Sequence, residues 1–398
     1  MLHAGIAIAA LITIIGGATI GVAGTLRAQE GPAAELVLPL PQVARRIDPI
    51  FAPASGALFA QASASVITPA SESLLRSDDG GTTWRAIDLP PAPADQDVRR
   101  AIAVDPLDHT ILYATGLDGL HKSDDDAASW RPILPTSGAQ ARLSISPADT
   151  RVVYGTLAVG FGASAPTRIV RSRDGGDTWD EILAMPCGGA WVFPDPSDAA
   201  RVSAALECGE TMPAALYASE DHGATWSPFG EWPKTDPALG VRLSGAILRG
   251  SQGGGSGALY AAFHEHSLET GIPLYRTDDR GATWNTLIVG PREETPPPSP
   301  KWQGGTFWAY VNALALDPAD PARFYVGLAG AARPLLTSAD GGATWSEIAL
   351  PCAGPPCSRK SITALALGID GQNLYVATAS GGGSDGSEGI YRLRLPAP

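Results

Sequence analysis

Aromatic side chains outside any repeated motif are the first candidates for ligand contact in this sequence. Of the ten tryptophans, four stand apart from the repeats described below: Trp191, Trp232, Trp302 and Trp308. The last two share a short stretch with Tyr310, after a proline-rich run. Such rings stack on sugars or hold a peptide. The alternative is that they only fix a long loop, and we favour it, because long loops stay ordered by burying side chains.

Basic residues that precede or begin short apolar segments form the second candidate set. They are Arg99, Arg100, Arg142, Arg242, Arg359 and Lys360. In a chain of formal net charge −13, a local group of positive charges attracts a carboxylate or an acidic partner. The alternative is that each base pairs with a neighbouring acid. Together the two sets predict a binding site made by Arg100, Arg142, Arg242, Trp302, Trp308 and Tyr310.

Patterns for catalysis or metal binding are weaker. Tyr310 and Glu293 could form a nucleophile pair, but their spacing does not require it, and no catalytic residue is assigned. His264 and His266 flank one glutamate and share a strand face only if nothing bulges between them. We therefore predict neither a metal site nor a cofactor.

The four cysteines, Cys187, Cys208, Cys352 and Cys357, favour disulfides. Zinc is disfavoured because neither a CxxC spacing nor a convergent histidine pair is present. Four cysteines allow three pairings. Proximity in the sequence suggests a bridge from Cys352 to Cys357 across a short loop, which leaves Cys187 to pair with Cys208.

The N-terminus predicts export. Residues 4–23 are an uncharged apolar run, long enough to cross a bilayer, and serve either as an uncleaved anchor or as a signal peptide. We expect residues 1–28 to be this segment and residues 29–398 to be one extracytoplasmic domain, secreted or membrane-anchored, and monomeric. The negative charge argues against nucleic acid and anionic membrane as partners, because both favour a basic surface.

An eight-residue motif recurs along the exported part. Ser77-Asp-Asp-Gly-Gly-Thr-Thr-Trp84 returns in four further intact copies and one decayed copy, on the pattern Ser/Thr-x-Asp-x-Gly-x-Thr-Trp. Its characteristic residues are Ser77, Asp79, Gly81, Trp84, Asp125, Trp130, Asp174, Gly176, Trp179, Asp221, Gly223, Trp226, Asp279, Gly281, Trp284, Asp340, Gly342 and Trp345. In the decayed copy Ala127 stands at the glycine position, and we expect that turn to be distorted or less stable.

Each motif belongs to a larger unit of four short strands, and the 46 glycines and 35 prolines suit many short strands joined by tight turns. Four strands per repeat indicate a propeller blade. Six units carry the motif, and a seventh has three strands before the chain ends. The segment Glu35–Leu40 resembles a detached fourth strand. The sequence therefore predicts an all-β, seven-bladed β-propeller of four-stranded blades, closed by an N-terminal strand that removes the exposed sheet edge.

The motif resembles the Asp-box, or bacterial neuraminidase repeat, over nearly all of the exported chain. The resemblance implies boxes on the turns between third and fourth strands, with ligands on the opposite face. The boxes are thus expected to be structural. Sialidases share the box, but their Arg-Ile-Pro signature is matched only by Arg46-Ile-Asp-Pro49, and their propellers have six blades. Xyloglucan-degrading enzymes use two facing propellers, whereas one is predicted here.

In architecture the chain is most similar to seven-bladed photosystem II assembly and stability factors, which bind a partner protein. We therefore expect a noncatalytic exported propeller that binds a partner protein or a glycan. The alternative is an exo-acting, sialidase-like glycoside hydrolase that uses the loop face opposite the boxes.

Overall fold

The structure of the chain is a computed structural model. It describes residues 34–39, 46–51, 56–63, 72–91, 100–136, 140–158, 166–185, 189–207, 215–231, 247–250, 259–262, 272–279, 282–289, 301–302, 305–306, 310–317, 320, 322–329, 334–350, 360–368, 371–380 and 388–395. Every element in these ranges is a β-strand, and no helix in them is long and apolar enough to cross a membrane.

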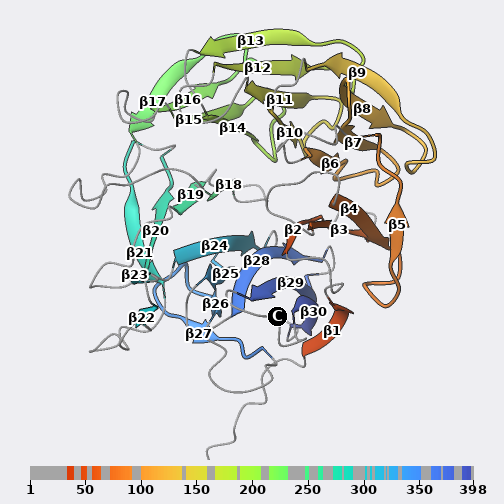
Figure 1. Cartoon of the computed structure of the whole chain (residues 1–398). Helices are drawn as coiled ribbons and strands as arrows, with labels where there is room; N and C mark the ends of the chain where they lie inside the picture. The colour runs from red at the N-terminus through yellow and green to blue at the C-terminus, as the bar shows by residue number, and fades with distance from the viewer. Residues whose placement is uncertain are drawn as a thin grey trace, which may run out of the picture. The chain divides into compact units, whose positions relative to one another are not determined.

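Seven four-stranded sheets, which we number blades I to VII, form the described domain (Figure 1). Blade I is β2 (Arg46–Phe51), β3 (Leu58–Ser63), β4 (Glu72–Ser77) and β5 (Arg85–Ile87). Blade II is β6 (Ile102–Val104), β7 (Leu112–Thr115), β8 (Gly119–Ser123) and β9 (Arg131–Pro135). Blade III is β10 (Gln140–Ile145), β11 (Val153–Ala158), β12 (Thr167–Ser172) and β13 (Asp180–Met185). Blade IV is β14 (Gly189–Pro194), β15 (Val202–Glu207), β16 (Ala215–Ser219) and β17 (Ser227–Glu231).

The remaining sheets follow the same order. Blade V is β18 (Ile247–Gly250), β19 (Leu259–Ala262), β20 (Ile272–Thr277) and β21 (Asn285–Val289). Blade VI is β24 (Tyr310–Leu316), β25 (Phe324–Ala329), β26 (Leu335–Ser338) and β27 (Ser346–Glu347). Blade VII is β28 (Lys360–Leu367), β29 (Asn373–Ser380), β30 (Gly389–Arg394) and β1 (Ala34–Pro39). A two-stranded ribbon, β22 (Lys301–Trp302) and β23 (Gly305–Thr306), precedes blade VI. The predicted seven-bladed propeller is confirmed.

The N-terminal strand completes blade VII, as the sequence predicted. β1 pairs antiparallel with β30, from Ala34 opposite Leu393 to Pro39 opposite Gly389. Arg392 of β30 donates to the Glu35 carboxylate at 2.5 Å. A Cβ on Gly389 would stand 2.0 Å from the carbonyl oxygen of Leu38, so this close pairing requires glycine. Closure of the ring therefore joins residues more than 350 positions apart in the sequence.

Apolar side chains of neighbouring blades pack together in shared clusters. Phe59 and Leu74 of blade I lie in one cluster with Ile102 and Leu112 of blade II, and all four are buried. A second cluster joins blade V to blade VI, where Tyr260 and Phe324 have ring centroids 5.5 Å apart. Because each sheet is buried on both faces by its neighbours, the strands show long runs of buried residues rather than simple alternation.

The order of the strands separates two ends of each blade. Successive strands are antiparallel, so the turn from the third to the fourth strand lies at the end opposite the start of the first strand. The repeated motif occupies that turn in blades I to VI. Starts of the first strands, where Arg100 and Arg142 occur, therefore lie at the other end. We call this end of the blades the mouth.

Replacing Gly389 by alanine is expected to weaken ring closure, because the new Cβ collides with the Leu38 carbonyl. We expect Gly389→Ala to lower the free energy of unfolding by more than about 1 kcal/mol, measured by urea denaturation. Gly371→Ala is the matched control, because Gly371 also has positive φ, +64°, but nothing stands within 4 Å of its added Cβ. An equal loss in both variants would show that β1 does not need the close approach.

Candidate functional site

The repeated turns are closed by side-chain hydrogen bonds to the backbone. In the first turn the Ser77 hydroxyl donates to Asp79 Oδ1 at 2.8 Å and accepts from the Gly81 amide at 2.8 Å. Asp79 Oδ1 accepts from the Thr83 amide at 2.8 Å, and Asp79 Oδ2 accepts from the Thr83 hydroxyl at 2.6 Å. The serine, aspartate and threonine of the motif thus fix each other and the turn they belong to.

The other turns repeat these bonds. The aspartate carboxylate accepts from an amide and a hydroxyl four residues on, in Asp125, Asp174, Asp221, Asp279 and Asp340. Gly281 lies outside the described residues. In the decayed copy the Ala127 amide still donates to the Ser123 hydroxyl at 2.8 Å. The expected distortion of that turn is therefore not found, although Ala127 takes φ +65°, a left-handed conformation that an L residue adopts at a cost.

The turns of blades I to IV and of blade VI also contact the outer strand of the preceding blade or the residues just after it. Trp84 Nε1 donates to the Val37 carbonyl of β1 at 3.1 Å, and Trp130 Nε1 donates to the Asp88 carbonyl beyond β5 at 2.9 Å. A Cβ on Gly223 would stand 2.6 Å from Ile182 of β13. Trp84, Trp130 and the glycine of the motif therefore help to dock one blade onto the previous one.

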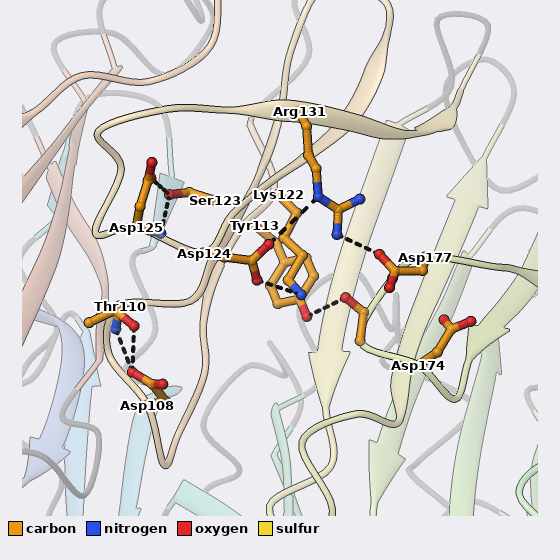
Figure 2. A network of polar contacts seen from close by, with 12 residues as sticks. Asp108, Thr110, Tyr113, Lys122, Ser123, Asp124, Asp125, Arg131, Asp174 and Asp177 are labelled. Atoms are coloured by element: carbon orange, nitrogen blue, oxygen red, sulfur yellow. Dashed lines mark hydrogen bonds and ion pairs between the residues drawn. The ribbon is translucent and has the colours of Figure 1, made fainter.

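A polar network on the same side links blades II and III (Figure 2). The Tyr113 hydroxyl donates to the Gly175 carbonyl at 2.9 Å, and burial raises the pKa of Tyr113 well above its ordinary value. Lys122 pairs with Asp124 at 2.7 Å, and its ammonium lies 5.8 Å from the centre of the Tyr113 ring. On the blade surface Arg131 reaches Asp177 of the next turn at 2.5 Å.

The hydrogen bonds of the turns hold their carboxylates ionised. Bonds from Thr83, then from Ser77, lower the pKa of Asp79 from 3.8 to about 2. The pKa values of Asp174, Asp279 and Asp340 are likewise lowered to about 2, chiefly by the threonine of each turn. These carboxylates are committed to their own turns, so they are poor general acids near neutral pH.

An arginine and a tryptophan meet at the mouth. Arg142 of β10 is exposed, and its guanidinium carbon lies 4.8 Å from the ring centre of Trp191 on β14, a half-buried side chain. The two first strands are joined where the Ser144 hydroxyl donates to the Val192 carbonyl at 2.8 Å. A cation over an aromatic face is attractive, and the contact orients the guanidinium plane. Blades III and IV thus present one fixed cationic and aromatic element.

Arg100 lies in a second polar group at the mouth, between blades I and II. Its amide donates to Glu72 Oε2 at 3.0 Å, and its Nη1 donates to the Pro90 carbonyl at 2.7 Å. Gln61 donates to the same carboxylate oxygen at 3.1 Å. Burial lowers the pKa of Arg100, although Glu72 opposes the effect, and its buried Nε has no hydrogen-bond partner among the described residues.

The structure places the other predicted site residues as follows. Tyr310 begins β24 and is half-buried, and Trp302 lies in β22. Arg242, Trp308, Glu293, His264, His266 and the four cysteines lie outside the described residues. Within the described ranges no group of three or more His, Cys, Asp or Glu is placed to hold a metal ion.

Sequence reasoning missed one histidine–aspartate contact near Arg100. His121 Nε2 lies 3.1 Å from Asp118 Oδ1. The imidazole packs against Gly116: a Cβ on this glycine would lie 2.6 Å from the His121 ring and 3.1 Å from the Pro90 side chain. A histidine three residues after an aspartate, with Gly116 and Gly119 around them, was the available signal.

Comparisons with known proteins find similarity to xyloglucanases and to YCF48. No protein-family model matches the chain. A xyloglucanase of Hypocrea jecorina is 24% identical over 297 residues, which are 62% of this chain and 32% of the relative. The GH74 xyloglucanase structure from Xanthomonas campestris superposes with a TM-score of 0.60 at 19% identity, covering 92% of this chain and 55% of that one. The structure of YCF48 bound to a D1 peptide superposes with a TM-score of 0.54 at 15% identity, covering 92% of this chain and 97% of that one.

These likenesses support the fold and leave the activity open. The chain spans about a third of the length of the curated relatives it matches. Structural neighbours below 25% identity share an architecture that hosts unrelated functions. This chain is accordingly a seven-bladed β-propeller with xyloglucanase and YCF48 structures among its neighbours.

The lowered pKa values of the turn aspartates predict a steep loss of stability in acid. A carboxyl with a folded pKa of about 2 and an unfolded value near 3.8 stabilises the fold above pH 4, and this contribution disappears as the pH falls from about 4 towards 2. We expect the free energy of unfolding, measured between pH 7 and 2, to fall mainly in that window. Asp79→Asn and Asp174→Asn should each make the fall shallower, and an unchanged slope in both would contradict this origin.

Proposed function

We propose that this chain is an exported, noncatalytic β-propeller that binds a partner protein or a glycan at its mouth. The observation that carries the proposal is the Arg142–Trp191 pair, an exposed cation held over an aromatic ring by two neighbouring blades. Exposed aromatic and arginine side chains dominate binding energies at protein interfaces. Arg100, half-buried and with an orphan Nε, adds a second cationic group at the same end of the blades.

The six repeated turns, on this proposal, are Asp-boxes with a structural role. Support comes from their bonds, which connect the turn to itself and to the preceding blade. Export is supported by the apolar run of residues 4–23 and by the even number of cysteines, for which we propose the Cys352–Cys357 and Cys187–Cys208 bridges. Arg242, Trp302, Trp308 and Tyr310 complete the proposed binding site.

A glycoside hydrolase is the second candidate, and one observation favours it. The curated relative matched over 62% of the chain is described as a xyloglucanase. Hydrolysis needs two carboxyl groups, or a tyrosine–glutamate pair, converging at a set separation in one site. Glu72 at the mouth accepts hydrogen bonds from Gln61 and from the Arg100 amide. These bonds favour a positioning role for Glu72.

The proposal predicts that ligand affinity depends on the mouth and not on the turns. The exported domain would be tested for binding to xyloglucan and uronate oligosaccharides and to envelope proteins, with sugar release measured in parallel. For any ligand found, Arg142→Ala and Trp191→Ala should each weaken binding about tenfold or more. Arg151→Ala is the matched control, an arginine with a 75% exposed side chain at the turn end of blade III.

Two outcomes would contradict the proposal. Equal affinity in the wild type and both mouth variants would remove the Arg142–Trp191 pair from the site. Sugar release that is abolished by Glu72→Gln, with folding intact, would make the chain a glycoside hydrolase.

A further inference from the structure

Charged side chains join neighbouring blades at their turn ends. Between blades I and II, Arg76 and Arg85 each pair with Asp78 of their own blade and with Asp126 in the turn of blade II. The Arg76 side chain is buried, and Asp126 is half-buried. Two cations are therefore matched by two aspartates, one from each blade.

The junction of blades II and III repeats this arrangement (Figure 2). Asp124 pairs with Lys122 at 2.7 Å and with Arg131 at 3.6 Å, and Arg131 also reaches Asp177 in the turn of blade III. The Tyr113 hydroxyl donates to the backbone of the same turn. Two cations again meet two aspartates, one from each blade, and the buried tyrosine has an acceptor.

Blade III keeps the cation of this arrangement but changes the residue that follows it. Arg171 stands on the third strand where blade II has Lys122, and it is 6% exposed. Two residues later, where blade II has Asp124, blade III has the exposed Arg173. One carboxylate comes from the fourth strand, where Asp180 Oδ2 accepts from Arg171 Nη2 at 3.0 Å. Blade III thus contributes two arginines and one aspartate.

The turn of blade IV adds no second aspartate to this group. The fourth residue of the motif, an aspartate in the turn of blade II, is His222 here, and the sixth, an aspartate in the turn of blade III, is Ala224. Arg171 Nη1 donates instead to the His222 carbonyl at 2.8 Å. Among the residues that the structure describes, Arg173 makes no ion pair. The junction of blades III and IV therefore has an excess of positive charge.

Polar atoms buried at this junction have no hydrogen-bond partner among the described residues. They are Arg171 Nε, the Tyr154 hydroxyl and His222 Nδ1. Burial raises the pKa of Tyr154 to about 12, and the positive charges of Arg171 and Arg173 oppose the rise, so both arginines act on this hydroxyl. The hydroxyl is therefore a donor at neutral pH. Buried donors without an acceptor destabilise the fold, so the group favours an added acceptor.

These donors face blade IV. Tyr154 lies opposite Ser144 on one side and opposite Arg171 on the other, and side chains directly opposite each other share a face of the sheet. The Ser144 hydroxyl donates to the Val192 carbonyl of blade IV, which identifies that face. Tyr154 and Arg171 therefore point towards the blade that carries His222.

Other acids near the group are already engaged. Both carboxylate oxygens of Asp149 accept from the Arg151 guanidinium, and both oxygens of Asp221 accept from Thr225. Glu220 is engaged as well. These carboxylates therefore do not take the place of the second aspartate.

We propose that the turn ends of blades III and IV form a binding site for a small oxyanion, phosphate or sulfate, held by Arg171, Arg173, Tyr154 and His222. The anion supplies the second negative charge that an aspartate supplies at the two preceding junctions. Arginine N–H groups fit the oxygens of such anions, and His222 Nδ1 donates in the tautomer that carries a proton there. The site lies at the end of the blades opposite the mouth, so it does not depend on the ligand of the mouth.

Equilibrium dialysis of the full-length protein against radiolabelled phosphate, and separately sulfate, tests the site. We expect the wild type to retain a single ion per chain. Arg173→Asp, which copies Asp124 of blade II, should weaken retention at least about tenfold. Arg168→Ala is the matched control, an arginine of the same strand with a 45% exposed side chain at the mouth end, and should change nothing. Retention of neither ion by the wild type, or equal affinity in Arg173→Asp, would overturn the proposal.

A second variant supplies the second carboxylate from the chain itself. His222→Asp copies Asp126, which takes the same left-handed conformation, with φ +62° against +60° for His222. Bound phosphate should raise the Tm of the wild type above its value in chloride of equal ionic strength. In His222→Asp this difference should disappear, with a Tm in chloride at or above that of the wild type. An equal phosphate effect in both proteins would show that the site does not replace the aspartate.

Discussion

The contact of one blade's turn with the blade before it is the constraint on which the rest of this structure depends. A single four-stranded sheet of this length cannot bury both of its faces and needs neighbours on each side. Here neighbouring blades are held together in two places, in the core and at the turns. At the core, apolar residues of adjacent blades share clusters. At the turn end of the blades, the Trp84 indole donates to the Val37 carbonyl of the preceding blade. Arg392 of that blade donates to the carbonyl of Gly80, the fourth residue of the motif.

This division of labour agrees with the structural role that we propose for the repeated residues. Asp79 and its equivalents use both carboxylate oxygens inside the turn, which leaves them ionised and oriented toward backbone and threonine. Because the turns hold the blades together at one end, the residues at the other end can differ from blade to blade. At that end the first strands of blades III and IV bring Arg142 and Trp191 together, and the link between blades I and II positions Arg100 beside Glu72. If ligands bind at the mouth, as we propose, variation in these links would change the ligand without changing the ring.

Much of the fold could be predicted from the sequence because its signals are local and repeated. Seven units and the closing strand follow from patterns within each segment, and β1 pairs with β30 as the pattern of Glu35–Leu40 implied. Less of the candidate site could be predicted from the sequence. Arg142 was predicted to contribute, but its contact with Trp191 depends on which strands adjoin across two blades, and no local pattern encodes that. The turn with Ala127 keeps its hydrogen bonds because the serine and aspartate, rather than the glycine, supply them.

The central claim, that polar contacts between a blade and the next turn hold the ring together, is tested most directly by a double-mutant cycle. Arg76 of blade I pairs with Asp126 in the turn of blade II, and both side chains can be replaced. Stabilities of Arg76→Met, Asp126→Asn and the double variant, measured by urea unfolding, give their coupling energy. The account predicts a favourable coupling of about 1–3 kcal/mol, as expected for groups in direct contact within a network. A coupling within about 0.3 kcal/mol of zero would contradict it, because sites that do not interact add to that accuracy.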